Sequence, residues 1–115
     1  MAVLRVKMLR TLAEKSVGLI GAAPVYPVFF TTRWGIHTFG VLSPIDVLIL
    51  DKNNRVVSIC QNMKPNRIFF WNPVYDRVVE LPPGTITKKG ITPGSQIAFS
   101  NKQPTAPPAA NRATR

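Results

Sequence analysis

Residues 35–51 read GIHTFGVLSPIDVLILD, and the second half of this stretch decides the fold class. Side chains of an extended strand point alternately to its two faces, and from Ile45 to Leu50 apolar residues occupy both faces. A short apolar run of this kind is typical of a strand buried on both sides. Asp46 lies inside the run, and burying an unpaired carboxylate is costly, so we expect this carboxylate to be hydrogen-bonded.

The two halves of the stretch predict a hairpin. Gly40 and Pro44 bracket its corner, since a proline can begin a strand without removing a needed hydrogen-bond donor. With the turn between them, His37 lies diagonally across from Asp46 on one face, roughly 7–8 Å away between backbones. We therefore predict a polar cluster of His37, Thr38 and Asp46. Two roles stay open for it, fixing the register of the hairpin or contacting a ligand.

Short strand candidates, separated by turn sequences, recur along the rest of the chain. They cover residues 3–8, 25–31, 56–61, 68–71, 77–81 and 95–100. Asparagine, proline and glycine favour tight turns at 51–54, 82–84 and 92–94. A capping box of Thr11 and Glu14 predicts one short N-terminal helix over residues 11–19. This pattern favours a mainly β fold, a compact antiparallel β-sandwich or distorted barrel, over alternating β-α units.

The length of 115 residues suits a single domain, which we place at residues 1–100. Residues 101–115 hold no acid and no large apolar side chain, and they predict a disordered basic tail. The chain has 15 Lys and Arg against 5 Asp and Glu, a formal net charge of +10. A surplus of this kind favours polyanionic partners such as nucleic acid.

The same composition narrows the classes of function. The chain's one cysteine, Cys60, excludes an internal disulfide, and one cysteine with one histidine falls short of a metal site. No phosphate-binding glycine loop is present, so we expect no metal and no cofactor. Arg5, Lys7 and Arg10 interrupt the apolar residues of the N-terminal stretch. We therefore expect neither a signal peptide nor a membrane span, and we predict a cytoplasmic protein.

Residues 64–77 read KPNRIFFWNPVYDR, a segment in which basic and aromatic residues are interleaved. This composition is that of a platform for single-stranded nucleic acid, on which bases stack while cations hold phosphates. The contacts that it predicts are Lys64, Arg67, Trp71 and Arg77. The alternative is a core strand whose aromatic side chains alternate, with Phe69 and Trp71 facing one way and Phe70 the other.

Several motifs occur in order along the chain. They are TLAEKSVGLIG at 11–21, HTFG at 37–40, PIDVLILD at 44–51, VVELPPGT at 78–85 and KGITPGSQIAF at 89–99. Together they resemble a bacterial and archaeal family catalogued as domain of unknown function 192, over roughly residues 3–99. The resemblance implies a compact β fold with one short helix. It also implies that His37, Thr38, Gly40, Pro44 and Asp46 belong to one constellation, and it implies no established activity.

The element at 36–41 departs from the pattern of many members of that family. They have Phe-Trp-Met-Lys-Asn-Thr where this chain has IHTFGV, which resembles a His-Thr-Phe-Gly variant of the family. A role of the family's lysine and asparagine is therefore not carried over to this chain.

We predict a small β domain that acts as a ligand-binding or accessory module rather than as an enzyme. Two alternatives stay open. One is a single-stranded nucleic-acid-binding module that uses residues 64–77. The other is a small hydrolase-like enzyme that uses His37 with Asp46, since histidine suits acid–base work. Against catalysis, no nucleophile motif, second histidine or paired carboxylate accompanies His37.

Overall fold

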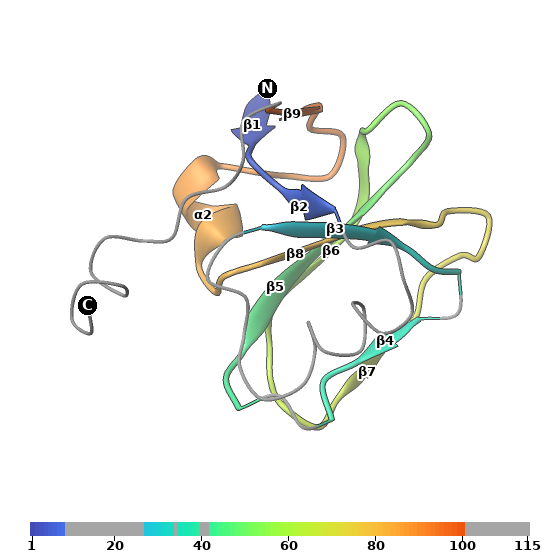
Figure 1. Ribbon diagram of the computed structural model, residues 1–115, viewed down its shortest axis with the longest axis vertical. Helices are drawn as coiled ribbons and strands as arrows, with labels where there is room; N and C mark the ends of the chain where they lie inside the picture. The colour runs from blue at the N-terminus through green and yellow to red at the C-terminus, as the bar shows by residue number, and fades with distance from the viewer. Residues whose placement is uncertain (9–26, 34, 40–41, 101–115) are drawn as a thin grey trace.

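The computed structural model describes residues 1–8, 27–33, 35–39 and 42–100, which form a mainly β structure (Figure 1). In chain order the elements are β1 (Ala2–Leu4), β2 (Lys7–Met8), β3 (Val28–Thr31), β4 (Ile36–His37), β5 (Ile45–Leu50), β6 (Val56–Met63), β7 (Ile68–Phe69), β8 (Arg77–Leu81), α2 (Thr85–Lys89) and β9 (Ile97–Phe99). The predicted mainly β class is confirmed. The helix predicted at 11–19 and the tail predicted at 101–115 lie outside the described residues.

The central sheet has five strands in the order β2-β3-β8-β5-β6. Its strand β5 pairs antiparallel with β8 along one edge and with β6 along the other, and all of its residues are buried. The prediction that this strand is covered on both sides is confirmed. β3 pairs antiparallel with β8, whereas β2 joins β3 in parallel.

Two smaller sheets contribute to apolar cores on opposite faces of the central sheet. The parallel pair β1–β9 and helix α2 pack on the face that carries Leu48 and Leu50. The antiparallel pair β4–β7 packs on the face that carries Val47 and Ile49. Figure 1 shows the β1–β9 pair near the top and the β4–β7 pair near the bottom, with the central sheet between them. The described chain therefore has two cores, one on each face.

The hairpin predicted within residues 35–51 is wrong. β4 pairs with β7 instead, so that Ile36 lies opposite Phe69 and His37 lies opposite Ile68. β5 cannot accept β4 as a neighbour, because β6 and β8 already occupy both of its edges. His37 and Asp46 are consequently in different sheets.

Other boundaries also differ from the predictions. The first strand candidate, 3–8, is divided into β1 and β2, which pair with different partners. The turn at 82–84 leads into α2, a helix that the sequence analysis did not predict. The described sheets are open at their edges, so they do not form a closed barrel. Among the described residues, no helix is long and apolar enough to cross a membrane.

Candidate ligand-binding site

Asp46 is buried in β5, and each of its carboxylate oxygens accepts a hydrogen bond from the main chain. Oδ1 accepts from the amide of Asn62 at 2.8 Å, and Oδ2 accepts from the amide of Ile86 at 3.0 Å. The first bond fixes the end of β6, where Asn62 has a left-handed φ of 53°. The second stabilises the first turn of α2, whose N-cap residue, Gly84, supplies no side-chain bond. The carboxylate therefore connects three elements of the fold.

Thr38 is fully buried and fixes the turn at 64–67 against the end of β4. Its hydroxyl donates to the carbonyl of Lys64 at 2.6 Å and accepts from the amide of Arg67 at 2.9 Å. Its main chain adds two more bonds, from its own amide to the Arg67 carbonyl and from the Asn66 amide to its carbonyl. One threonine therefore positions the backbone of both Lys64 and Arg67.

His37 is exposed and lies at the rim of a pocket, which we call the β4–β7 pocket. Nδ1 accepts a hydrogen bond from the amide of Phe39 at 3.2 Å, and the two rings stack with centroids 5.0 Å apart. The pocket has a volume of about 190 Å³ and is lined by Gly35, Ile36, His37, Phe39, Ile68 and Phe70. Ile68 is 54% exposed and Phe70 is 68% exposed. Clustered exposed apolar side chains of this kind are typical of a docking site.

Gly35 makes the packing of Phe70 possible. Its φ is +94°, and a Cβ at this position would lie 2.7 Å from the Phe70 ring and 2.9 Å from the Phe69 carbonyl oxygen. A larger residue would therefore displace the ring or the backbone as well as strain its own conformation. Glycine is required here for the shape of the β4–β7 pocket.

The three residues of the predicted polar cluster have separate surroundings. Among the described residues, no hydrogen bond joins His37 to Asp46, whose oxygens are bonded to Asn62 and Ile86. Thr38 and Asp46 are buried in the fold, and His37 alone of the three is exposed.

Two of the four predicted nucleic-acid contacts, Trp71 and Arg77, have partners inside the fold. The indole of Trp71 is half-buried, and its Nε1 donates to the carbonyl of Tyr75 at 2.8 Å. The guanidinium of Arg77 lies 4.7 Å from the centre of the Phe29 ring, and its Nε donates to Oδ1 of Asn54. Trp71 and Arg77 therefore contribute to the packing of the fold, and neither of them lines the β4–β7 pocket.

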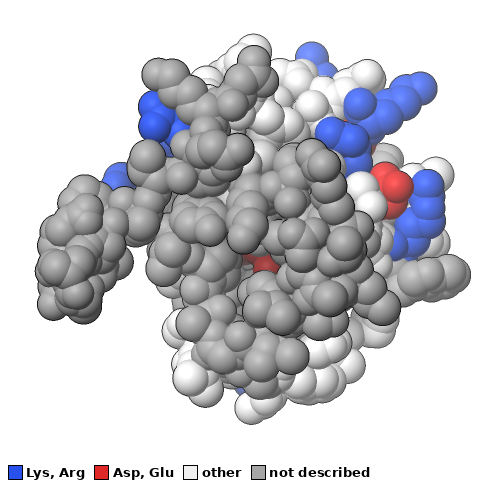
Figure 2. Space-filling view, viewed as in Figure 1, with Lys and Arg blue, Asp and Glu red and all other residues white. Residues whose placement is uncertain are grey.

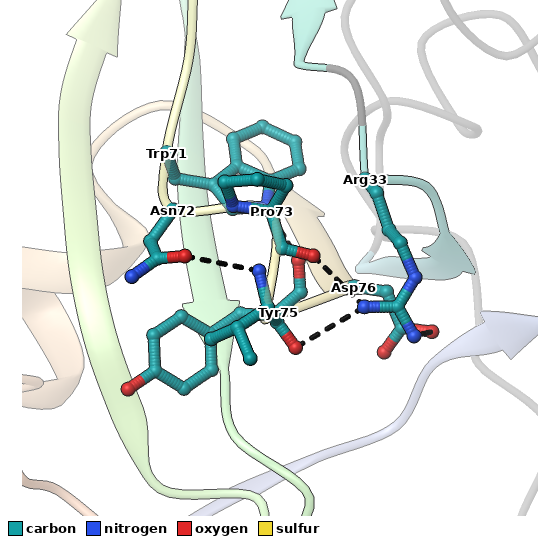
Figure 3. A network of polar contacts seen from close by, with 7 residues as sticks. Arg33, Trp71, Asn72, Pro73, Tyr75 and Asp76 are labelled. Carbon is teal, nitrogen blue, oxygen red and sulfur yellow. Dashed lines mark hydrogen bonds and ion pairs between the residues drawn. The ribbon is translucent and has the colours of Figure 1, made fainter.

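The loop that follows β7 is braced by Arg33 (Figure 3). Its guanidinium donates to the carbonyls of Pro73 at 2.8 Å and Val74 at 3.2 Å, and it forms an ion pair with Asp76 at 3.4 Å. The side-chain oxygen of Asn72 accepts from the amide of Val74 within the same loop. These bonds fix residues 72–76, which follow the pocket residue Phe70 in the sequence.

The other two predicted contacts, Lys64 and Arg67, are exposed. In the sequence they come shortly before Ile68, a residue of the β4–β7 pocket. The alternating pattern of a strand is also observed, because Phe69 and Trp71 pack on the core whereas Phe70 points outward. No role in a site was predicted from the sequence for Phe39, Ile68 or Phe70. For Phe70 the signal was this alternation, which places its ring on the outer face.

Glu80 is a buried carboxyl group that the sequence analysis missed. It lies in β8 opposite Val28 and Val47, and within the part of the chain that the structure describes neither carboxyl oxygen has a hydrogen-bond partner. Burial raises the pKa of Glu80 to about 8, so the group is largely protonated at neutral pH. Its sequence signal was an acid among apolar neighbours in VVEL, at residues 78–81.

Cys60 is half-buried in β6. Burial and, to a smaller extent, the negative charge of Asp46 raise the pKa of its thiol. A raised pKa disfavours the nucleophilic thiolate form, so nothing in its setting favours thiol chemistry.

We expect the substitution Thr38→Val to destabilise the protein by about 2 kcal/mol, because it leaves the partly buried amide of Arg67 without its hydroxyl acceptor and the carbonyl of Lys64 without its hydroxyl donor. Urea unfolding measures the loss, and hydrogen exchange at the Arg67 amide should accelerate. The control is Thr87→Val, which removes an exposed hydroxyl that accepts from Gln61. An equal loss for the two variants would contradict the bracing role of Thr38.

These observations define the class: a mainly β protein whose exposed apolar pocket rests on a buried hydrogen-bond network. The chain belongs to the family DUF192, described as Uncharacterized ACR, whose model matches residues 2–99. The family inferred from the motifs of the sequence is therefore confirmed.

Two crystal structures resemble the fold. One is a protein of unknown function from Novosphingobium aromaticivorans DSM 12444, with a TM-score of 0.68 and 22% identity, covering 81% of this chain and 73% of that one. The other, from Sinorhizobium meliloti 1021, has a TM-score of 0.63 and 20% identity, covering 79% of this chain and 78% of that one. Among curated proteins, none matches this chain significantly. The likenesses support the fold alone.

Proposed function

We propose that this protein is a binding module rather than an enzyme, and that its ligand occupies the β4–β7 pocket. One observation carries the proposal: Phe39, Ile68 and Phe70 are exposed together around a single concavity. Exposed apolar side chains are stabilised when a ligand removes them from water, by about 25 cal/mol for each Å² covered. A cluster of them on a braced backbone is suited to binding.

The size of the β4–β7 pocket limits what enters it. At about 190 Å³ it is smaller than the 300–1,000 Å³ of pockets that hold drug-sized molecules. One flat ring or one apolar side chain of a larger ligand suits this volume. The stacked rings of His37 and Phe39 provide a flat wall for such a group.

The hydrolase alternative has less support. Both oxygens of Asp46 accept bonds from main-chain amides, so this carboxylate is not available to orient His37. Among the described residues that line the β4–β7 pocket, His37 is the one with a titratable side chain. A lone histidine without an orienting partner, a nucleophile or a second acid–base group is poorly equipped for hydrolysis.

Two finer expectations from the sequence belong to this proposal. The chain is the His-Thr-Phe-Gly variant of its family, and this element supplies both rings of the His37–Phe39 stack. The location is cytoplasmic. The similar protein from Sinorhizobium meliloti is described as a candidate transcription regulator, and a binding module is compatible with that description.

Indole, a flat apolar ring, tests the proposal directly. We expect millimolar binding of indole, detected as NMR amide shifts at His37, Phe39, Ile68 and Phe70, because a ligand of this size seldom binds more tightly. Phe70→Ala should remove most of the effect. Val74→Ala is the matched control, since Val74 is 65% exposed but does not line the β4–β7 pocket. Shifts that survive Phe70→Ala unchanged would contradict the proposal.

A further inference from the structure

We infer that the ligand of the β4–β7 pocket is single-stranded nucleic acid, bound with one base in the pocket and with its phosphates on Lys64 and Arg67. This inference rests on the proposed function and names its ligand. It differs from the prediction made from the sequence, because the stacking residues become His37, Phe39 and Phe70 in place of Trp71.

The first support is the way in which the cations are placed. The buried hydroxyl of Thr38 bonds to the main chain of Lys64 and of Arg67, and Thr38 lies between His37 and Phe39 in the sequence. The main chain that carries both cations is therefore hydrogen-bonded to the residue that lies between the two rings. Ligands that carry charge and rings at a regular spacing gain from such preorganisation, because less conformational freedom is lost on binding.

The second support is that both cations are free to meet an anion. Neither Lys64 nor Arg67 has a carboxylate partner among the described residues, where the ion pair present joins Arg33 to Asp76. The Arg67 guanidinium makes two long contacts, at 3.5 Å and 3.3 Å, with the carbonyls of Pro65 and Asn66 through a single nitrogen. Its remaining N–H groups can donate to phosphate.

The acids of the described chain do little to offset this positive charge. Asp46 and Glu80 are buried, and burial keeps the pKa of Glu80 high enough for its proton to remain at neutral pH. Asp51 accepts bonds from the amides of its own turn, and Asp76 is paired with Arg33. On the face in Figure 2, the described surface carries more Lys and Arg than Asp and Glu, gathered at the upper left and at the right of the view rather than at the bottom, where Figure 1 places the β4–β7 pair. A positive field of this kind attracts polyanions.

The third support is the arrangement of the rings. The stack of His37 on Phe39 offers one flat surface, and the Phe70 ring, 68% exposed, offers another across the pocket. Bases of a single strand can stack on such surfaces, whereas in a duplex the neighbouring base pairs cover the faces of each base. An acidic peptide with one aromatic residue would satisfy the same cations and the pocket, and its binding is one outcome of the test below.

The experiment measures fluorescence anisotropy of the full chain with a labelled single-stranded RNA of about 12 nucleotides, within the usual site sizes of such modules. Phe70→Ala removes the ring on which one base stacks, so it should weaken binding about 5-fold to 100-fold. Val74→Ala removes no stacking ring and should change the affinity less than about 2-fold. Log affinity falls as log salt concentration rises. Arg67→Ala should make this negative slope shallower by about 0.7, the value for one phosphate of a single strand. The exposed Lys89 of α2 is the matched control, and Lys89→Ala should leave the slope unchanged.

Three results would overturn the inference. One is equal affinity for the single strand and for its duplex. Another is RNA affinity that Phe70→Ala leaves unchanged, which would mean adsorption by charge alone. The third is binding of an acidic peptide that Phe70→Ala abolishes, without binding of RNA. In each case the indole measurement separates the two claims: shifts that depend on Phe70 mean that only the ligand class is wrong, and their absence means that the site itself is wrong.

Discussion

Replacing Glu80 with glutamine is expected to remove most of the pH dependence of stability between pH 5 and pH 8. In the folded protein the pKa of this carboxyl group is raised to about 8 by burial, against 4.5 for the ordinary group. The unfolded chain therefore releases the proton near pH 4.5, and the folded chain holds it until about pH 8. Stability from this group is complete below pH 4.5 and is lost as the pH rises to about 8.

The size of the loss follows from the shift in pKa. One pKa unit corresponds to about 1.4 kcal/mol, so the wild-type protein should lose about 4 kcal/mol of unfolding free energy across this range through Glu80. Glutamine has nearly the same shape and no charge, so Glu80→Gln should match the wild type at pH 5 and exceed it at pH 8. Urea unfolding at several pH values measures both differences.

Asp76→Asn serves as the control for Glu80→Gln, because Asp76 is partly exposed and paired with Arg33. Its profile between pH 5 and pH 8 should run parallel to that of the wild type. A parallel profile for Glu80→Gln itself would mean that the carboxyl group at position 80 reaches water in the folded protein.

The second large effect is expected from Asp46→Asn. The substitution leaves one oxygen where two are needed, so the new amide group faces the N–H of either Asn62 or Ile86. One of these two amides then has no acceptor, and the other donates to a neutral oxygen in place of a charged one. We expect a cost of about 2–4 kcal/mol. Thermal or urea unfolding gives the loss, and hydrogen exchange shows whether the first turn of α2 opens first.

Asp51→Asn is the matched control for Asp46→Asn. Oδ1 of Asp51 accepts from the amides of Asn53 and Arg55, and one asparagine oxygen can accept both bonds. We expect a loss below about 1 kcal/mol. If the two variants lose similar amounts, Asp46 does not connect β5, β6 and α2 in the way that its distances indicate.

Much of the fold could be predicted from local patterns. The apolar run at 45–50 gave the buried strand β5, and β8 has the predicted bounds. The turn at 92–94 could be predicted because Pro93 and Gly94 suit successive corners of a type II turn; Gly94 has φ 93°, and the Ser95 amide donates to the Thr92 carbonyl. In each of these places the chemistry of neighbouring residues determines the conformation.

The predictions are wrong where contacts between residues distant in the sequence determine the structure. Two residues of β4 hold too little pattern to identify their partner, and the occupied edges of β5 are a property of the whole sheet. Helix α2 has glycine at its N-cap and threonines in its sequence, so its start lacks a local signal, whereas Lys88, Lys89 and the C-cap Gly90 are signals of its end. Its stability comes from the buried side chain of Ile86 and from the bond of the Ile86 amide to Asp46.

The candidate site could likewise be predicted in part, from its individual segments but not from the contacts between them. From the sequence, His37 and Thr38 were predicted in one polar cluster with Asp46, and Lys64 and Arg67 in a separate basic and aromatic segment. The sequence alone could not bring the two segments together, since their proximity depends on the β4–β7 pairing and on the buried bonds of Thr38. The exposed rings of the β4–β7 pocket emerge only once that pairing is known.

The most direct test of the account is an NMR titration of the full chain with single-stranded RNA, followed through the backbone amides. We predict that the largest shifts fall on His37, Phe39 and residues 64–70, and that they saturate together. Shifts concentrated instead at the cations of α2, Lys88 and Lys89, or spread evenly over the basic residues, would contradict a ligand site at the β4–β7 pocket.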